Sequence, residues 1–98
     1  MKRRMMGVVV RTITINAPKN GDTGSCSIYT SPVGEMNPGT TITIRIGGYR
    51  GGDYVFIDFV SVSGAKIHIG EADISGRDET VLTFTPTESG EIILSYWE

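Results

Sequence analysis

Short runs in which apolar and polar residues alternate one by one recur along this chain of 98 residues. Side chains alternate between the two faces of a β-strand, so this period of two predicts strands with one buried face. The clearest run is residues 41–46, in which isoleucine alternates with threonine or arginine. Gly, Pro, Asn and Ser separate the runs, and no useful window has helical periodicity. The pattern predicts a chain that is β from one end to the other.

The other runs bring the prediction to about seven strands. Val8–Ile15 changes the parity of its apolar residues part-way, which indicates a bulge or two separate pieces. Tyr54–Val62 is apolar on both faces, as in a central strand covered on both sides. Loops are predicted at 18–24, 31–39, 47–53 and 70–79. In the remaining short strands we expect these side chains to point inward: Cys26, Ile28, Ile67, Ile69, Leu82, Phe84, Ile92, Leu94 and Tyr96. We expect Lys66, His68, Ile93 and Trp97 to point outward.

Many short strands in one small chain favour a β-sandwich, because a parallel sheet would need crossover helices. We predict a single domain over residues 1–98, with residues 1–6 frayed, folded as an all-β, two-sheet antiparallel sandwich of immunoglobulin-like size. A small jelly roll or barrel is the alternative. Cys26 is the only cysteine, which excludes an internal disulfide and a zinc site built on several cysteines.

Three stretches resemble the strand starts of prokaryotic immunoglobulin-like domains: Pro38–Ile44, Phe84–Thr87 and Gly90–Leu94. In such domains Pro-Gly precedes a strand, and a proline and a glycine make the corner between two late strands. The resemblance implies a non-catalytic module for adhesion, spacing or assembly. The chain departs from the family pattern at Ile92, where a corner tyrosine is common, and after Trp97, where a further strand normally follows.

This departure leaves one edge of the strand at residues 91–97 to be covered. We expect the N-terminal run Val8–Ile15 to fold back and complete the sheet, because natural sheets avoid bare edges. The alternative is that another chain supplies a strand, which would make the protein an assembly subunit. Ile93 and Trp97 on the outer face would then be interface anchors. Trp97 could equally be packed over the end of the sandwich by the N-terminal segment.

Composition argues against several classes of function. The formal net charge of −2 gives no general attraction for nucleic acid. No stretch approaches the roughly 20 apolar residues of a membrane helix, and the run Met5–Val10 is too short for the core of a secretory signal. We expect a soluble protein without membrane insertion, and the sequence leaves its compartment open: intracellular, viral, or a domain excised from a surface protein.

No catalytic, cofactor or metal site is predicted. The only histidine, His68, is expected on a solvent face without the partners that acid–base catalysis needs. We expect Asp58 to meet water or to pair with Arg45 on a neighbouring strand, because an unpaired buried carboxylate is costly. Cys26 is expected to be a small buried hydrophobe.

Two loops carry residues that could bind a partner or an ion. The glycine-rich loop at residues 47–52 lacks the motif of a phosphate-binding loop and the repetition of Arg-Gly-Gly segments, so it reads as a hairpin connection. Tyr49 and Arg50 at its centre are residue types enriched at protein interfaces. The acidic loop 70–79 could hold calcium, although it lacks EF-hand spacing.

We therefore expect a structural or protein–protein interaction module, a subunit of a surface or particle assembly. The expected partner is another protein or a second copy of the chain. The candidate interaction surface is Tyr49, Arg50, Ile93 and Trp97. The alternative is a small carbohydrate-binding module in which two rings among Tyr29, Tyr49, Tyr54 and Trp97 stack on a sugar.

Overall fold

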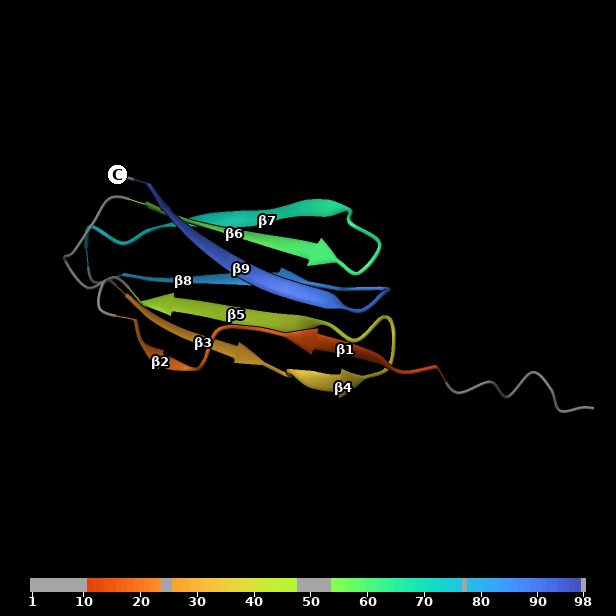
Figure 1. The fold of residues 1–98 in the computed structure, drawn as a ribbon. Coiled ribbons are helices and arrows are strands. Elements are labelled where there is room, and N and C mark those ends of the chain that lie inside the picture. The colour runs from red at the N-terminus through yellow and green to blue at the C-terminus, as the bar shows by residue number, and fades with distance from the viewer. Residues whose placement is uncertain (1–10, 24–25, 48–53, 77, 98) are drawn as a thin grey trace, which may run out of the picture.

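The computed structural model describes residues 11–23, 26–47, 54–76 and 78–97, without the side chains of Asp22, Tyr96 and Trp97. These residues form nine strands in two sheets, of five and four strands (Figure 1). The five-stranded sheet has the order β4-β1-β9-β6-β7 and the four-stranded sheet the order β2-β3-β5-β8. The strands are β1 (Ile13–Asn16), β2 (Gly21–Asp22), β3 (Ser27–Ser31), β4 (Gly34–Met36), β5 (Ile42–Gly47), β6 (Tyr54–Ser61), β7 (Lys66–Asp73), β8 (Glu79–Phe84) and β9 (Gly90–Trp97). The predicted all-β, two-sheet architecture is confirmed.

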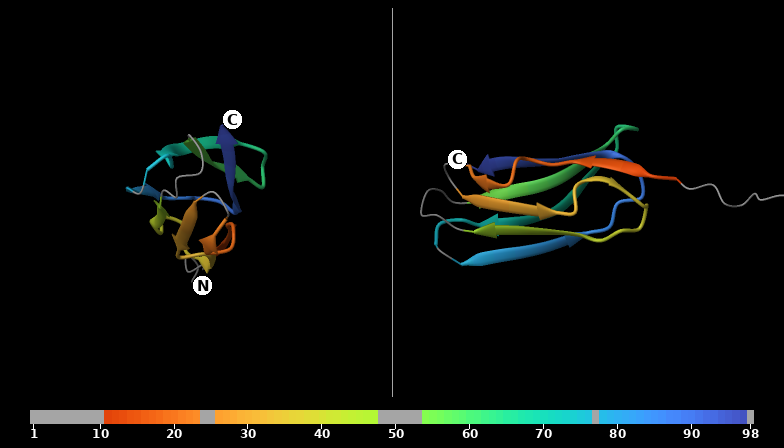
Figure 2. Two further views of the ribbon diagram at one scale, coloured as in Figure 1. Left: turned by 90° about the vertical axis from the view of Figure 1, so that its left-hand side faces the viewer. Right: turned by 90° about the horizontal axis from the view of Figure 1, so that it is seen from below.

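The two sheets form two layers around an apolar core (Figure 2). Ile42, Ile44 and Ile46 of β5 are at most 1% exposed, as their alternation predicted. From the other sheet, β6 buries Val55, Ile57 and Phe59, and it lies between two neighbouring strands as expected for a central strand. No helix in the described part is long and apolar enough to cross a membrane.

Three segments predicted as loops contain strand residues. β2 lies within the predicted loop 18–24 and β4 within the predicted loop 31–39. β7 continues to Asp73, four residues into the predicted loop 70–79. These segments alternate weakly, and hydrogen bonding to better-patterned neighbours makes them strands, since β-propensity depends strongly on context.

β7 contains a bulge that the sequence pattern did not predict. Ile57 pairs with Gly70 and Asp58 pairs with His68, so Ile69 is an extra residue on β7. Ile69 packs against the core, but Ile67 is 46% exposed. Ile67 lies opposite the buried Phe59 and so faces inward as predicted, and it stays partly exposed because β7 is the outermost strand of its sheet.

The N-terminal strand completes the five-stranded sheet over part of its length. β1 pairs antiparallel with β4 and parallel with β9, an exception to the otherwise antiparallel pairing. Its contact with β9 comprises Ile15 opposite Gly90 and Asn16 opposite Glu91. β9 then runs obliquely away from β1, while β6 follows it from Gly90 to Trp97 (Figure 1). The fold-back prediction is confirmed for β1, and residues 8–10 lie outside the described part.

Candidate functional site

Beyond Glu91, the edge of β9 that faces away from β6 has no partner strand among the described residues. The Val62 N–H donates to the Ser89 carbonyl at 2.9 Å, one step beyond the Ser61–Gly90 pair that ends the β6–β9 register. Facing pairs of antiparallel strands alternate between hydrogen-bonded and non-bonded. Every second residue of β9 after Ser89 therefore bonds to β6 through its backbone. The backbone N–H and C=O groups of the residues between them point away from β6.

This alternation identifies the backbone groups at the open edge. Glu91, Ile93 and Ser95 direct their N–H and C=O groups to β6. The N–H and C=O groups of Ile92, Leu94 and Tyr96 point away from β6 instead. The Ile92 N–H donates to the Asn16 carbonyl, as the parallel pair of Asn16 with Glu91 requires, and the groups after it lie at the open edge. Unpaired groups of this kind are a template for a strand from another chain.

Apolar side chains lie on both faces of the open edge. On the inner face Ile92 is 1% exposed, and the half-buried Leu94 packs against the core. On the outer face Ile93 is 36% exposed and lies opposite Asp58. The predicted outward orientation of Ile93 is therefore confirmed. A strand added to this edge would therefore find apolar contacts on both of its faces.

An open hollow of about 390 Å³ lies where β1 leaves β9. Val60, Val62 and Ile93 give it apolar walls, and Asn16 and Glu91 are among its polar ones. Because Asn16 and Glu91 are the last residues of the β1–β9 pairing, the hollow adjoins the start of the open edge. Pockets beside an open edge give strand addition its side-chain specificity.

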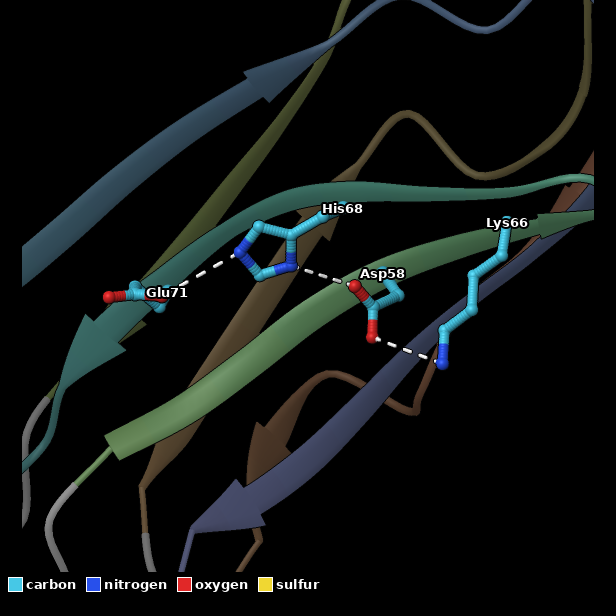
Figure 3. A network of polar contacts seen from close by, with 4 residues as sticks. All are labelled: Asp58, Lys66, His68 and Glu71. Carbon is cyan, nitrogen blue, oxygen red and sulfur yellow. Dashed lines mark hydrogen bonds and ion pairs between the residues drawn. The ribbon is translucent and has the colours of Figure 1, made fainter.

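Asp58 is the centre of a polar network on the outer face of β6 and β7 (Figure 3). The His68 Nδ1 lies 2.8 Å from one oxygen of its carboxylate, and because a carboxylate only accepts, Nδ1 is the donor. The Lys66 Nζ lies 3.9 Å from the other oxygen. The His68 Nε2 lies 3.6 Å from the carboxylate of Glu71. The network gives the Asp58 side chain, which is only 13% exposed, the partners it needs.

This network corrects two predictions. Asp58 does not pair with Arg45, which lies on β5 in the other sheet and pairs with Glu79 at 3.3 Å. His68 was expected to be without partners, but the register of β6 and β7 places it beside Asp58. Long-range pairing of this kind depends on strand order, which the local pattern of a sequence does not contain.

The acidic residues of the predicted loop 70–79 have separate partners. Glu71 faces His68 and Glu79 faces Arg45. Asp73 accepts hydrogen bonds from the hydroxyl and the N–H of Ser75, which lower the pKa of its carboxyl below the ordinary value. Across the described residues, no group of three or more His, Cys, Asp or Glu side chains is placed to hold a metal ion.

Of the four residues predicted as an interaction surface, Ile93 is the one whose side chain the structure places. Tyr49 and Arg50 lie outside the described residues. Trp97 pairs through its backbone register with Tyr54, and its side chain lies outside the description. The sequence analysis missed Val60, Val62 and Glu91 as neighbours of Ile93. The outward parity of Val60 and Val62 was the available signal.

The aromatic residues of the carbohydrate alternative are divided between the sheets. Tyr29 is 53% exposed on β3, and Tyr54 is 43% exposed on β6. These two strands belong to different sheets, so the two rings do not share one sheet face. A sugar platform that uses Tyr49 or Trp97 stays a prediction. Cys26 is fully buried in the core, as expected for a small hydrophobe.

Comparisons with protein-family models, with curated proteins and with solved structures found no match.

Proposed function

We propose that this chain is a non-catalytic structural module that joins an assembly by accepting a strand from another protein chain at the open edge of β9. The observation that supports this proposal is the uneven pairing of β9. β6 pairs with all of it, but β1 pairs only with Gly90 and Glu91. Main-chain hydrogen bonds to an added strand would supply affinity.

The other sheet edges in the described part have features that oppose strand addition. β7 presents Lys66 and His68 and contains the bulge at Ile69, and charges and bulges discourage pairing at an edge. β8 runs alongside β7, and Leu82 packs so closely on Gly70 that an added Cβ would lie 3.0 Å from it. β2 and β4 have only two and three residues.

The open part of β9 lacks these protective features. From Ile92 to Tyr96 it contains no charged residue, no proline and no bulge in its pairing with β6. Ser95 and the Tyr96 hydroxyl are its only polar side-chain groups. A sequence with these properties at a sheet edge is typical of one that pairs with another chain.

The experiment is to measure the solution mass of the full chain by light scattering over a wide range of concentrations. We expect the mass to rise with concentration. Leu94→Pro removes an N–H that points to the open edge and leaves the bonds to β6 in place, so this variant should stay monomeric. Leu94→Ala is the matched control: it removes the same side chain, keeps the N–H, and should still associate.

Hydrogen exchange tests whether the edge is open in the monomer. In dilute solution the amides of Leu94 and Tyr96 should exchange much faster than those of Ile93 and Ser95, which bond to β6. Equal protection of both sets would mean that the chain covers its own edge, and would contradict the proposed function.

A further inference from the structure

Resting on this proposed function, we infer that the added strand is residues Met5–Val10 of a second copy of this chain, which lies parallel to β9 and joins copies head to tail. This segment precedes the described residues and consists of Met, Gly and Val alone. A strand that is apolar on both faces is typical of one that is covered on both faces. The open edge offers this environment, since Ile92 and Leu94 lie on one face and Ile93 on the other.

The lengths of the segment and the edge agree. Met5–Val10 has six residues, and the open edge from Ile92 to Trp97 also has six. Strand residues rise equally on both sides of a ladder, so the segment can pair with the whole edge.

The same segment is badly placed to reach the edge of its own chain. Ile15 is level with Gly90, so the start of β1 at Ile13 is level with residue 88. A return to Ile92 would cover four strand residues, roughly 13 Å, and would have to pass the part of β9 that β1 already occupies. This path would use most of the apolar segment before it reached the edge. A second copy is under no such constraint.

Parallel addition fixes how two copies are arranged. β1 already runs parallel to β9, so a parallel donor segment leads into a second β1 that points the same way. If Met5 is level with Ile92, the second Ile15 lies level with a point twelve residues beyond Gly90, which is a shift of roughly 40 Å. The start of β1 and the end of β9 lie at opposite ends of the sandwich (Figure 1), so the second copy lies beyond the end of the first.

This arrangement continues indefinitely. Each copy uses one surface to donate and a different surface to accept, and a heterologous contact that does not close produces a linear assembly. A copy at one end keeps a free donor segment, and a copy at the other end keeps an open edge.

In the parallel orientation the basic residues before the donor segment have an acidic neighbour. Lys2, Arg3 and Arg4 immediately precede the apolar segment. In the parallel register these three basic residues would lie at the start of the open edge, beside the hollow that the exposed Glu91 lines. An antiparallel segment would place these cations at the far end of β9, which Glu98 follows in the sequence, so the repeat distance of the assembly and not charge distinguishes the two orientations.

The decisive experiment mixes two variants that each lack one half of the contact. A chain without residues 2–10 can accept a strand but not donate one, and Leu94→Pro can donate but not accept. We expect each variant alone to be monomeric by light scattering. Their equimolar mixture should form a complex of two chains and nothing larger, while the full chain should form a series of oligomers that lengthens with concentration.

Point variants guard against loss of folding. Val9→Asp places a charge in the donor segment and should abolish association, whereas Val9→Thr keeps a β-branched side chain and should retain most of it. Thermal unfolding should show that both variants remain folded. In the two-chain complex, the acceptor amides of Leu94 and Tyr96 should become protected, and electron microscopy of full-chain oligomers should show a repeat near the roughly 40 Å of the register.

Two outcomes would overturn the inference. Association that survives deletion of residues 2–10 but is lost in Leu94→Pro would show that another strand, such as a second β9, uses the edge; the proposed function would then stand. A full chain that stays monomeric at every concentration, with fast exchange at Leu94 and Tyr96, would exclude a second copy as the donor.

Discussion

The Asp58 carboxylate lies 2.8 Å from Nδ1 of His68, directly across the pair formed by β6 and β7. The bulge at Ile69 immediately precedes this pair in the register, and it sets which residue of β7 faces Asp58. A carboxylate that is mostly buried on a sheet face thus finds its donor on the adjacent strand.

This contact should contribute measurably to stability. Asp58→Ala and His68→Ala should each lower the free energy of unfolding by about 1 kcal/mol, because each removes a hydrogen bond to a charged group that is partly screened by solvent. In the double variant the losses should not add, and the coupling should be about 0.5 kcal/mol or more. Urea unfolding of the four proteins measures this. Strictly additive losses would mean that the contact contributes nothing.

Gly90 is required at the start of β9 because of how closely the chain packs there. A Cβ on this residue would lie 2.4 Å from Cζ of Phe59 and 2.5 Å from the carbonyl oxygen of Val60. Gly90→Ala should therefore lower the free energy of unfolding by about 2–3 kcal/mol. Gly76→Ala is the control, since nothing lies within 4 Å of its Cβ position. Equal melting temperatures for the two variants would contradict this account.

The side-chain hydroxyl of Thr30 is buried in the core and makes no hydrogen bond. The residue is 1% exposed, and its Oγ1 has no hydrogen-bond partner, while its N–H donates to the Asn20 side chain at 2.9 Å. Thr30→Val keeps the shape and the backbone bond but removes the buried hydroxyl. We expect it to raise the free energy of unfolding by about 1 kcal/mol, measured by urea unfolding. Thr43→Val on the opposite face of the same sheet should have a smaller effect, and a loss of stability in Thr30→Val would refute the prediction.

The turn after β7 should show a pH dependence that comes from Asp73. The Ser75 hydroxyl and N–H donate to its carboxylate at 2.6 and 2.9 Å, and they lower its pKa. A pKa that is lower in the folded than in the unfolded chain contributes stability above the unfolded value, about 3.9, and this contribution is lost as the pH falls through the folded value. Carboxyl titration by NMR should show a higher Asp73 pKa in Ser75→Ala, with Ser75→Thr close to the wild type. An unchanged pKa in Ser75→Ala would contradict the proposed cause.

The sequence predicted the core strands well, because each carries its own evidence. Ile42, Ile44 and Ile46 alternate with polar residues, and burial of one face of a strand requires only that pattern. The same reasoning identified β6 as a central strand and placed Ile93 outward and Ile92 inward. The short strands β2 and β4 have too few residues to show a period, so their sequences could not predict them.

By itself, the sequence determined that this chain forms strands and which faces of the well-patterned strands are buried. Only the tertiary structure decided that β1 covers β9 at Gly90 and Glu91 and no further, and that Asp58 meets His68 rather than Arg45. The physical reason is that alternation along a strand records burial, which is a local property. Strand order, register and the place where one strand leaves another depend on contacts between residues far apart in the chain.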